Sequence, residues 1–238
     1  MTVREVHAAA LAALPEAEVP AYLTAHSGLP GPRGNLEALY AFGDVAPPGL
    51  VERLADDEDE YLRTCGTAAL GRLLVEAPDE AARAALTRTL TERARDPLWR
   101  VREGAAMAGQ RVGEAWPEGL VALTGYWLAA GDPLAARAAV AALCEPPILR
   151  ASALLRAAAL DACDAATDQL RAVPTERRRD PDVRTLRQGL AYCWSVAVAA
   201  DPPAGLPRFH ALADDPDPDV AWVARENAKK ARLAKLLH

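Results

Sequence analysis

Asp217-Pro-Asp-Val-Ala-Trp-Val-Ala-Arg225 is the clearest copy of a unit that recurs along the sequence and predicts its fold. In such a stretch Asp can cap the free backbone N–H groups of a helix, and Pro suits the first helical turn. The same unit, an acidic turn followed by an arginine and then small residues, occurs four more times upstream: Asp57-Glu-Asp-Glu-Tyr-Leu-Arg63, Asp96-Pro-Leu-Trp-Arg-Val-Arg102, Asp132-Pro-Leu-Ala-Ala-Arg137 and Asp180-Pro-Asp-Val-Arg184. The five arginines are 39, 35, 47 and 41 residues apart. Self-similarity at a period near 40 residues is typical of a helical solenoid.

The composition of the chain also favours helices. Of the 238 residues, 51% are hydrophobic and 25% are charged, with a net charge of −6, which is too apolar for a disordered chain. Ala and Leu, both strong helix formers, supply 54 and 32 residues, whereas aromatic residues make up only 5%. The residues that fill pleated sheets are therefore scarce, and we expect no sheet.

These patterns predict an all-α chain, a right-handed α-α superhelix of about five helix pairs over residues 47–238 with an N-terminal helical cap over residues 1–46. The first helices of the pairs are predicted at 47–56, 79–95, 116–130, 147–173 (broken near Asp161) and 203–213. The second helices are predicted at 59–76, 97–113, 133–144, 181–200 and 218–237. The long interval before Arg184 indicates an insertion near residues 175–180.

With its Asp-Pro-Asp-x-Val-Arg helix starts, the sequence resembles the HEAT-repeat family, specifically the short bacterial type found in PBS-lyase-like proteins. Residues 217–233 look like a terminal repeat of such proteins, and the resemblance covers about residues 47–238. It implies an armadillo-like α solenoid with an extended surface for partners. It implies little about activity, because such scaffolds host many roles.

The sequence offers no catalytic, metal or cofactor motif. It lacks GxSxG, HExxH and P-loop patterns, and its four histidines (7, 26, 210 and 238) are far apart. We interpret the acidic residues 56–60 as a solvated turn, because they lack the spacing of a calcium loop. Residues 28–34, with Arg33 before the helix cap Asn35, could hold an anion, but we favour a rigid Pro/Gly connection. We lean against an enzyme and expect no cofactor.

Cysteine usage and hydropathy predict a cytoplasmic protein. Cys65, Cys144, Cys163 and Cys193 form no CxxC pair, so buried free thiols are expected. Uncharged runs such as residues 188–200 are too short to span a bilayer, and no signal peptide is recognisable. Arg outnumbers Lys 24 to 3, which suggests a high-GC bacterial genome.

A repeated aromatic and cationic pattern marks the candidate binding residues. Trp99-x-x-Arg102 recurs as Trp222-x-x-Arg225, with Trp and Arg on one helix face. On a continuous last helix, Lys229, Arg232 and Leu236 would share the face of Trp222, opposite a small-residue face of Val220, Ala224, Asn227 and Ala231. A packing role is the favoured alternative for Trp99, whereas for Trp222 packing over Leu206 or Phe209 and binding are left open.

The distribution of charge adds Arg184 and Arg187 to the candidate binding residues. Residues 1–119 carry 12 Arg and 19 acidic residues, whereas residues 120–238 carry 15 basic and 14 acidic residues, including six arginines within 171–187. The complete candidate set is Trp99, Arg102, Arg184, Arg187, Trp222, Arg225, Lys229 and Arg232. The arginines at 63, 102, 137 and 184 repeat with the fold unit, so we also expect them to bond acidic groups or carbonyls of neighbouring turns.

The preferred function is a monomeric, non-enzymatic scaffold that binds a partner protein along its concave or C-terminal face. The alternative is nucleic-acid binding, because some HEAT-like proteins are alkylpurine DNA glycosylases; here Trp99, Trp194 and Trp222 with neighbouring arginines would supply the contacts. The overall acidity counts against it. A bilin-lyase-like chaperone is a second alternative that rests on the resemblance alone. No membrane partner is expected.

Overall fold

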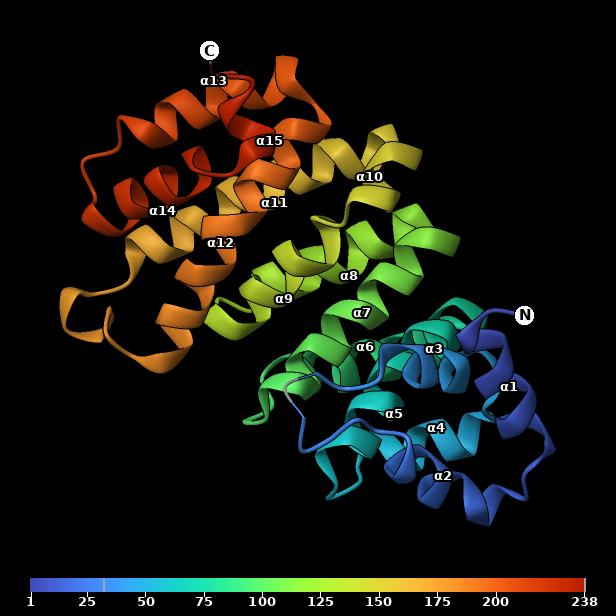
Figure 1. Cartoon of the computed structure of the whole chain (residues 1–238). Helices are drawn as coiled ribbons and strands as arrows, with labels where there is room; N and C mark the ends of the chain where they lie inside the picture. Colours follow the sequence, from blue (N-terminus) through green and yellow to red (C-terminus); the bar gives the residue numbers. More distant parts are fainter. Residues whose placement is uncertain (32, 238) are drawn as a thin grey trace. The chain divides into compact units, whose positions relative to one another are not determined.

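The computed structural model describes residues 1–31 and 33–237, and its helices are labelled in Figure 1. Pro32, within the loop of residues 28–34, and His238 lie outside the described residues. Over the described part the chain has fifteen α-helices, two 3-10 helices and no strand, so the prediction of an all-α chain is confirmed. The chain divides into two compact units, Met1–Val112 and Gly113–His238. The predicted division at residue 46 and the handedness of a superhelix remain predictions.

The first unit contains four short N-terminal helices and the first two predicted pairs. Its helices are α1 (Val3–Ala13), a 3-10 helix (Glu16–Glu18), α2 (Val19–Ala25), α3 (Leu36–Val45), α4 (Pro48–Ala55), α5 (Glu60–Glu76), α6 (Glu80–Ala94) and α7 (Trp99–Ala115), which continues past the end of the unit. Helices α2 and α3 pack against α5, and α1 packs on α3. The N-terminal helices therefore cover the first predicted pair, α4 and α5.

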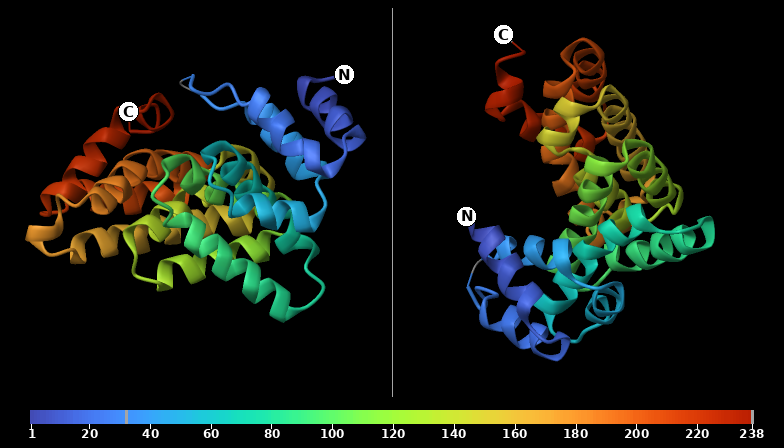
Figure 2. Two further views of the ribbon diagram at one scale, coloured as in Figure 1. Left: turned by 90° about the horizontal axis from the view of Figure 1, so that it is seen from below. Right: turned by 90° about the vertical axis from the view of Figure 1, so that its right-hand side faces the viewer.

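The second unit contains the other three predicted pairs. Its helices are α8 (Pro117–Ala129), α9 (Pro133–Leu143), α10 (Pro146–Ala151), α11 (Ala153–Ala172), a 3-10 helix (Thr175–Arg177), α12 (Pro181–Ala200), α13 (Pro202–Ala213), α14 (Pro218–Ala228) and α15 (Ala231–Ala234). Helix α12 is central, because it contacts α9, α11, α13 and α14 (Figures 1 and 2). The 3-10 helix lies in the predicted insertion at residues 175–180.

Asp side chains start most of the second helices of the pairs, as the sequence predicts. Asp59 accepts hydrogen bonds from the backbone N–H groups of Tyr61 and Leu62, and Asp132 and Asp217 cap α9 and α14 in the same way. Asp180 is an exception: it makes no cap bond and instead pairs with Arg177 at 3.1 Å. The acidic residues 56–60 are thus a capping turn.

Two helix boundaries differ from the prediction, and both have local causes. The long helix predicted at 147–173 breaks at Ser152 and not near Asp161, because Ser152 is extended and its hydroxyl caps α11 at the N–H of Leu155. The predicted helix 218–237 ends at Ala228, because Lys230 is extended (φ −75°, ψ 124°) and starts the short helix α15.

Small residues allow close helix contacts in the first unit. A Cβ atom on Gly66 would lie 2.1 Å from the backbone N of Ala55 in α4. A Cβ atom on Gly71 would lie 2.3 Å from the carbonyl oxygen of Ala108 in α7. Both distances are well inside van der Waals contact, so α5 can pack between these helices only with glycine at the two positions.

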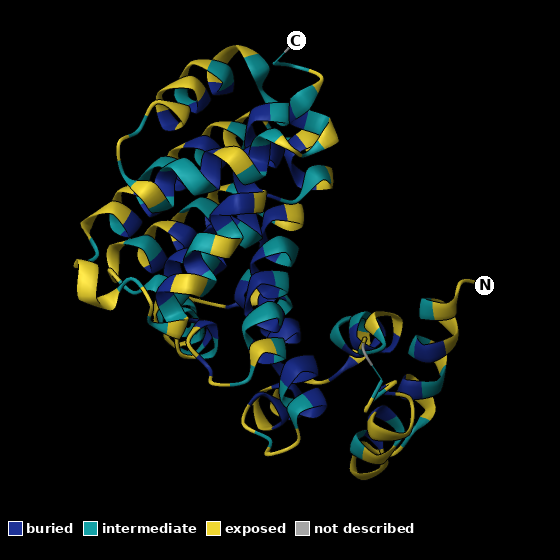
Figure 3. Ribbon diagram, turned by 60° about the vertical axis from the view of Figure 1, so that its left-hand side comes forward, coloured by how far each residue is buried: buried dark blue, intermediate teal, exposed yellow. Residues whose placement is uncertain are grey.

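Buried residues lie on the helix faces that meet other helices, and exposed residues lie on the outer turns (Figure 3). Trp127 and Trp194 are fully buried in the second unit, and the indole N–H of Trp194 donates to the hydroxyl of Thr167 at 3.1 Å. The four cysteines are free and buried, as predicted. Among the described helices none is long and apolar enough to cross a membrane.

Candidate interaction surface

Six of the candidate residues lie on α12, α14 and α15 of the second unit, where a buried asparagine fixes α14 to α12. The Asn227 side chain is fully buried, and its Oδ1 accepts a hydrogen bond from the backbone N–H of Ser195 at 2.8 Å. Its Nδ2 donates to the carbonyl oxygens of Leu190 at 2.9 Å and Val223 at 2.8 Å. The residues opposite Asn227 on α14 are thereby turned outward.

Arg187 and Trp222 form the first aromatic and cationic contact of this surface. The guanidinium carbon of Arg187 in α12 lies 4.5 Å from the centre of the Trp222 ring in α14. The same guanidinium donates to Asp219 at 2.5 Å. Trp222 is half-buried, and this cation lies over one face of its ring; packing of Trp222 over Leu206 or Phe209 remains a prediction. A cation over an indole ring is a favourable and orienting contact.

Tyr192 and Arg232 form the second contact, which the sequence patterns do not indicate. Tyr192 is 45% exposed, and Arg232 lies over its ring at 4.7 Å while donating to its hydroxyl at 2.9 Å. Lys230 lies 6.0 Å from the same ring. Because the helix ends at Ala228, Arg232 leaves the predicted continuous face with Trp222, and Ala231 is exposed instead of packing in the small-residue face.

Two arginines of the surface are exposed and make no ion pair or hydrogen bond with the described residues. These are Arg184, near the start of α12, and Arg225, in the last turn of α14. Lys229 is also exposed but pairs with Glu226 at 2.5 Å. We call Arg184, Arg187, Tyr192, Trp222, Arg225 and Arg232 the aromatic–cation surface. It combines two rings with four guanidinium groups, and two of these groups make no ion pair with the described residues.

Trp99 and Arg102 belong to the first unit, and the structure does not place them with the other candidates. Trp99 is 51% exposed at the start of α7, so the packing role favoured from the sequence is wrong. The guanidinium of Arg100 covers its ring at 4.6 Å and is itself paired with Glu60 at 2.9 Å. Arg102 donates to the carbonyl oxygens of Asp96 at 2.7 Å and Pro97 at 3.0 Å.

Two of the four repeated arginines have the structural role that their spacing predicts. Arg63 pairs with Asp96 of the next turn at 3.3 Å, and Arg102 bonds the carbonyls of its own turn. The expectation is wrong for Arg184, which makes no ion pair or side-chain hydrogen bond with the residues that the structure describes. Arg178 of the inserted segment takes that position, and it bonds Asp217 at 2.6 Å and Asp219 at 3.3 Å.

These ion pairs also set the electrostatics at one end of the surface. Hydrogen bonding to Arg178 holds the pKa of Asp217 below its ordinary value, and the same bond raises the pKa of Arg178. Arg171 pairs with Asp215 at 2.6 Å nearby, and that pairing raises the pKa of Arg171. Carboxylates therefore neutralise most of the six arginines within residues 171–187. The surface is patterned with both signs of charge, not continuously basic.

Other clusters of reactive groups carry no obvious chemistry. His7 donates to or accepts from the Tyr22 hydroxyl at 2.8 Å, and His26 stacks on Tyr22, so these two histidines have structural partners. Cys144 and Cys163 lie 3.9 Å apart, and for Cys144 the hydrogen bond with Cys163, with burial, raises the thiol pKa. The part of the chain that the structure describes holds no group of three or more ligands suited to a metal ion.

Comparison with known proteins assigns no family. No family model matches the chain, and no curated protein matches it. Similar solved structures include an engineered protein, with 18% identity over 99% of this chain and 98% of that one and a TM-score of 0.39. A designed armadillo-repeat protein in complex with a (KR)4 peptide has 13% identity over 98% of this chain and 100% of that one, with a TM-score of 0.40. At these TM-scores the similarities carry no argument, and HEAT-repeat membership remains a prediction.

Proposed function

We propose that this chain is a non-enzymatic interaction module whose aromatic–cation surface binds an acidic segment of a partner protein. The observation that carries the proposal is the pair of exposed guanidinium groups without an ion pair among the described residues, Arg184 and Arg225, on the two helices that carry the rings of Tyr192 and Trp222. Tyr, Trp and Arg are the residue types that contribute most to protein interfaces. Arg can also bind a carboxylate through two parallel hydrogen bonds.

The distribution of acidic side chains favours a protein partner over nucleic acid. Asp219 accepts from Arg187, and Glu226 pairs with Lys229, so carboxylates interrupt the cations of the surface. A phosphate backbone carries a charge on every nucleotide and would meet these carboxylates at close range. An acidic protein segment can place its charges only where Arg184 and Arg225 lie. Nucleic-acid binding is therefore the second candidate, and the test below separates the two.

The test compares charge reversal at the unpaired arginines with a matched reversal elsewhere. The probes are a fluorescein-labelled 12-residue peptide of alternating Glu and Phe, and a 20-base-pair DNA duplex, both at about 0.15 M salt. The variant Arg184→Glu with Arg225→Glu removes no ion pair or side-chain hydrogen bond among the described residues, so its circular-dichroism melt should stay close to that of the parent. The control variant, Arg33→Glu with Arg88→Glu, makes the same change of net charge at exposed positions of the first unit.

We expect the peptide to bind the parent and the control equally, and the surface variant at least about tenfold more weakly, which corresponds to about 1.4 kcal/mol. Equal loss in both variants would show that net charge alone drives binding and would refute the proposal. Binding of the duplex alone, lost only in the surface variant, would replace the protein partner with nucleic acid.

A further inference from the structure

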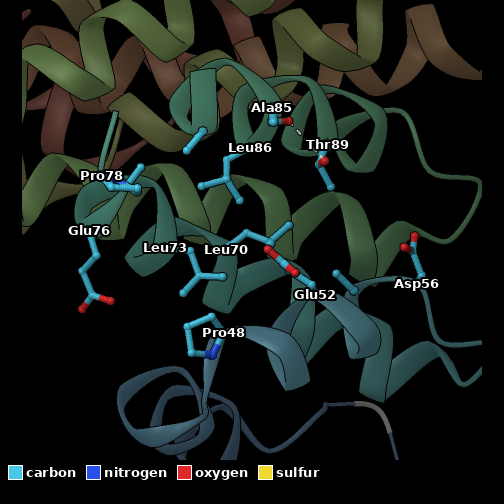
Figure 4. A pocket seen from close by; sticks show the side chains of 13 residues that line it. Pro48, Glu52, Asp56, Leu70, Leu73, Glu76, Pro78, Ala85, Leu86 and Thr89 are labelled. Carbon is cyan, nitrogen blue, oxygen red and sulfur yellow. Dashed lines mark hydrogen bonds between the residues drawn. The ribbon is translucent and has the colours of Figure 1, made fainter. Parts of the chain in front are cut away.

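An apolar groove lies in the first unit, between α4, α5 and α6. It has a volume of about 500 Å³. Pro48 and Glu52 come from α4, Leu70 and Leu73 from α5, and Leu86 from α6 (Figure 4). Figure 4 shows these side chains turned toward the same space. The residues that line it are Pro48, Glu52, Ala55, Asp56, Leu70, Leu73, Glu76, Ala77, Pro78, Ala82, Ala85, Leu86 and Thr89.

The groove exposes an apolar stripe that a helix of a repeat protein normally buries. Residues 82, 85, 86 and 89 of α6 line it with the i, i+3, i+4, i+7 spacing of one helix face. Ala85 is exposed and Leu86 is half-buried, although α6 packs against α5 at their common side. The hydroxyl of Thr89 is turned back to the carbonyl oxygen of Ala85 at 3.3 Å, so the wall presents little polarity.

The charged side chains of the lining are all acidic. Glu52, Asp56 and Glu76 belong to it, and no lysine or arginine does. Glu52 is exposed and has no ion pair among the described residues. Asp56 pairs with Arg93 and Glu76 with Arg72, but the carboxylate side chains remain 73% and 54% exposed. Each of them can therefore still face a cation from solution.

The positions of the three carboxylates describe the shape of a suitable ligand. Glu76 and Asp56 lie at opposite ends of the groove, and Glu52 lies between them (Figure 4). They do not converge on one point, as they would around a metal ion or a small amine. A ligand that meets all three must be elongated, must be apolar on the side that faces the leucines, and must carry several separate positive charges.

We propose that this groove binds a basic amphipathic helix from a partner protein. Leucine-sized side chains of the partner pack against Pro48, Ala85 and Leu86, above a floor formed by the buried Leu70 and Leu73, and its Lys or Arg side chains lie beside Glu52, Asp56 and Glu76. Helix-in-groove recognition uses such anchors at i, i+3 or i+4 spacing. The groove is separate from the aromatic–cation surface, and its ligand is basic and not acidic, so this proposal does not depend on the proposed function. A second copy of this chain is a poorer occupant, because Leu233 of its basic C-terminal segment is already fully buried.

The test uses the full chain and three 16-residue fluorescein-labelled peptides. The first has Leu at i, i+3, i+4 and i+7 positions and Lys on the other face; the second replaces each Lys by Glu; the third replaces each Leu by Ser. We expect saturable binding of the first peptide at micromolar concentration and at least tenfold weaker binding of the other two, by fluorescence anisotropy at about 0.15 M salt.

Substitutions in α6 then locate the site. Ala85→Lys places a charge and a long side chain in the groove at an exposed position, so we expect the chain to fold and binding to fall at least tenfold. Ala81→Lys makes the same substitution at an exposed position of α6 outside the lining and should leave binding unchanged. Glu52→Lys should weaken binding severalfold without touching the apolar floor.

Three results would overturn the inference. The first is no binding of the Leu/Lys peptide, and the second is binding that Ala85→Lys leaves intact. The third is concentration-dependent self-association of the chain, in sedimentation velocity, that Ala85→Lys abolishes, because the groove would then be an interface between copies. The charge reversals at Arg184 and Arg225 should have no effect on this peptide, so the two proposals fail independently.

Discussion

Replacement of Asn227 by alanine should destabilise the second unit strongly. The side chain is fully buried and makes two hydrogen bonds from α14 to α12, with Ser195 and Leu190. Each such bond contributes about 1 kcal/mol net, and an unsatisfied buried partner adds to the loss. The Ser195 N–H loses the acceptor that Asn227 supplies, and the small cavity left by the amide adds to the loss. We expect the free energy of unfolding to fall by about 3 kcal/mol.

Urea unfolding followed by tryptophan fluorescence measures this change, because Trp194 lies on α12 and is fully buried. The midpoint should move to lower urea with the slope unchanged, as for a pure stability effect. Asn227→Asp is the informative companion variant. It keeps the shape and the acceptor for Ser195 but faces the Leu190 and Val223 carbonyls with a buried charge. Its stability should therefore recover as the pH falls and the carboxyl becomes protonated.

The reasoning would be refuted if Asn227→Ala cost less than about 1 kcal/mol. It would also be refuted if Asn227→Asp were as stable as the parent at neutral pH, because the amide would then not be the link between α14 and α12. In either case the outward orientation of Trp222 and Arg225 would need another cause.

Three further predictions concern residues with contrasting surroundings. Arg102→Ala should lower the free energy of unfolding by about 1–3 kcal/mol, because the variant loses hydrogen bonds to two carbonyl oxygens. Arg184→Ala should change the free energy of unfolding by less than about 0.5 kcal/mol. Equal urea midpoints for the two variants would contradict this prediction. Gly71→Ala should lower the free energy of unfolding by about 1–3 kcal/mol, because the added methyl group forces α5 away from α7. Gly125 has open space around it, so Gly125→Ala should be neutral or should stabilise the fold by up to about 1 kcal/mol. Thermal melts of the two variants test this contrast. The folded-state pKa of Asp217 is lowered, so its ion pair with Arg178 stabilises the fold above the ordinary aspartate pKa and is lost as the pH falls through the folded pKa. Arg178→Ala should reduce stability at pH 7 and flatten the decline of stability below about pH 4, measured by urea midpoints against pH; an unchanged acid slope would exclude Asp217 as its source.

Local sequence patterns suffice to predict the helix pairs and the residues at which most of them begin. Helix propensity and Asp capping act over a few residues, so Asp59, Asp132 and Asp217 could be assigned from their neighbours alone. The period of the Asp and Arg unit, near 40 residues, is likewise visible without coordinates. The same local rules located the insertion at residues 175–180.

The packing of the helices determines which arginines have an acidic partner and where a groove is left between helices, and the sequence does not show either. Arg184 and Arg178 look alike in sequence, but the partners of Arg178 are about 40 residues away, and only the packing of α14 on α12 brings them within reach. The helix break before Lys230 separates Arg232 from Trp222 and brings it to Tyr192. The groove beside α6 also depends on the spacing of three helices. Such contacts join residues that are distant in the chain, and no local pattern encodes them.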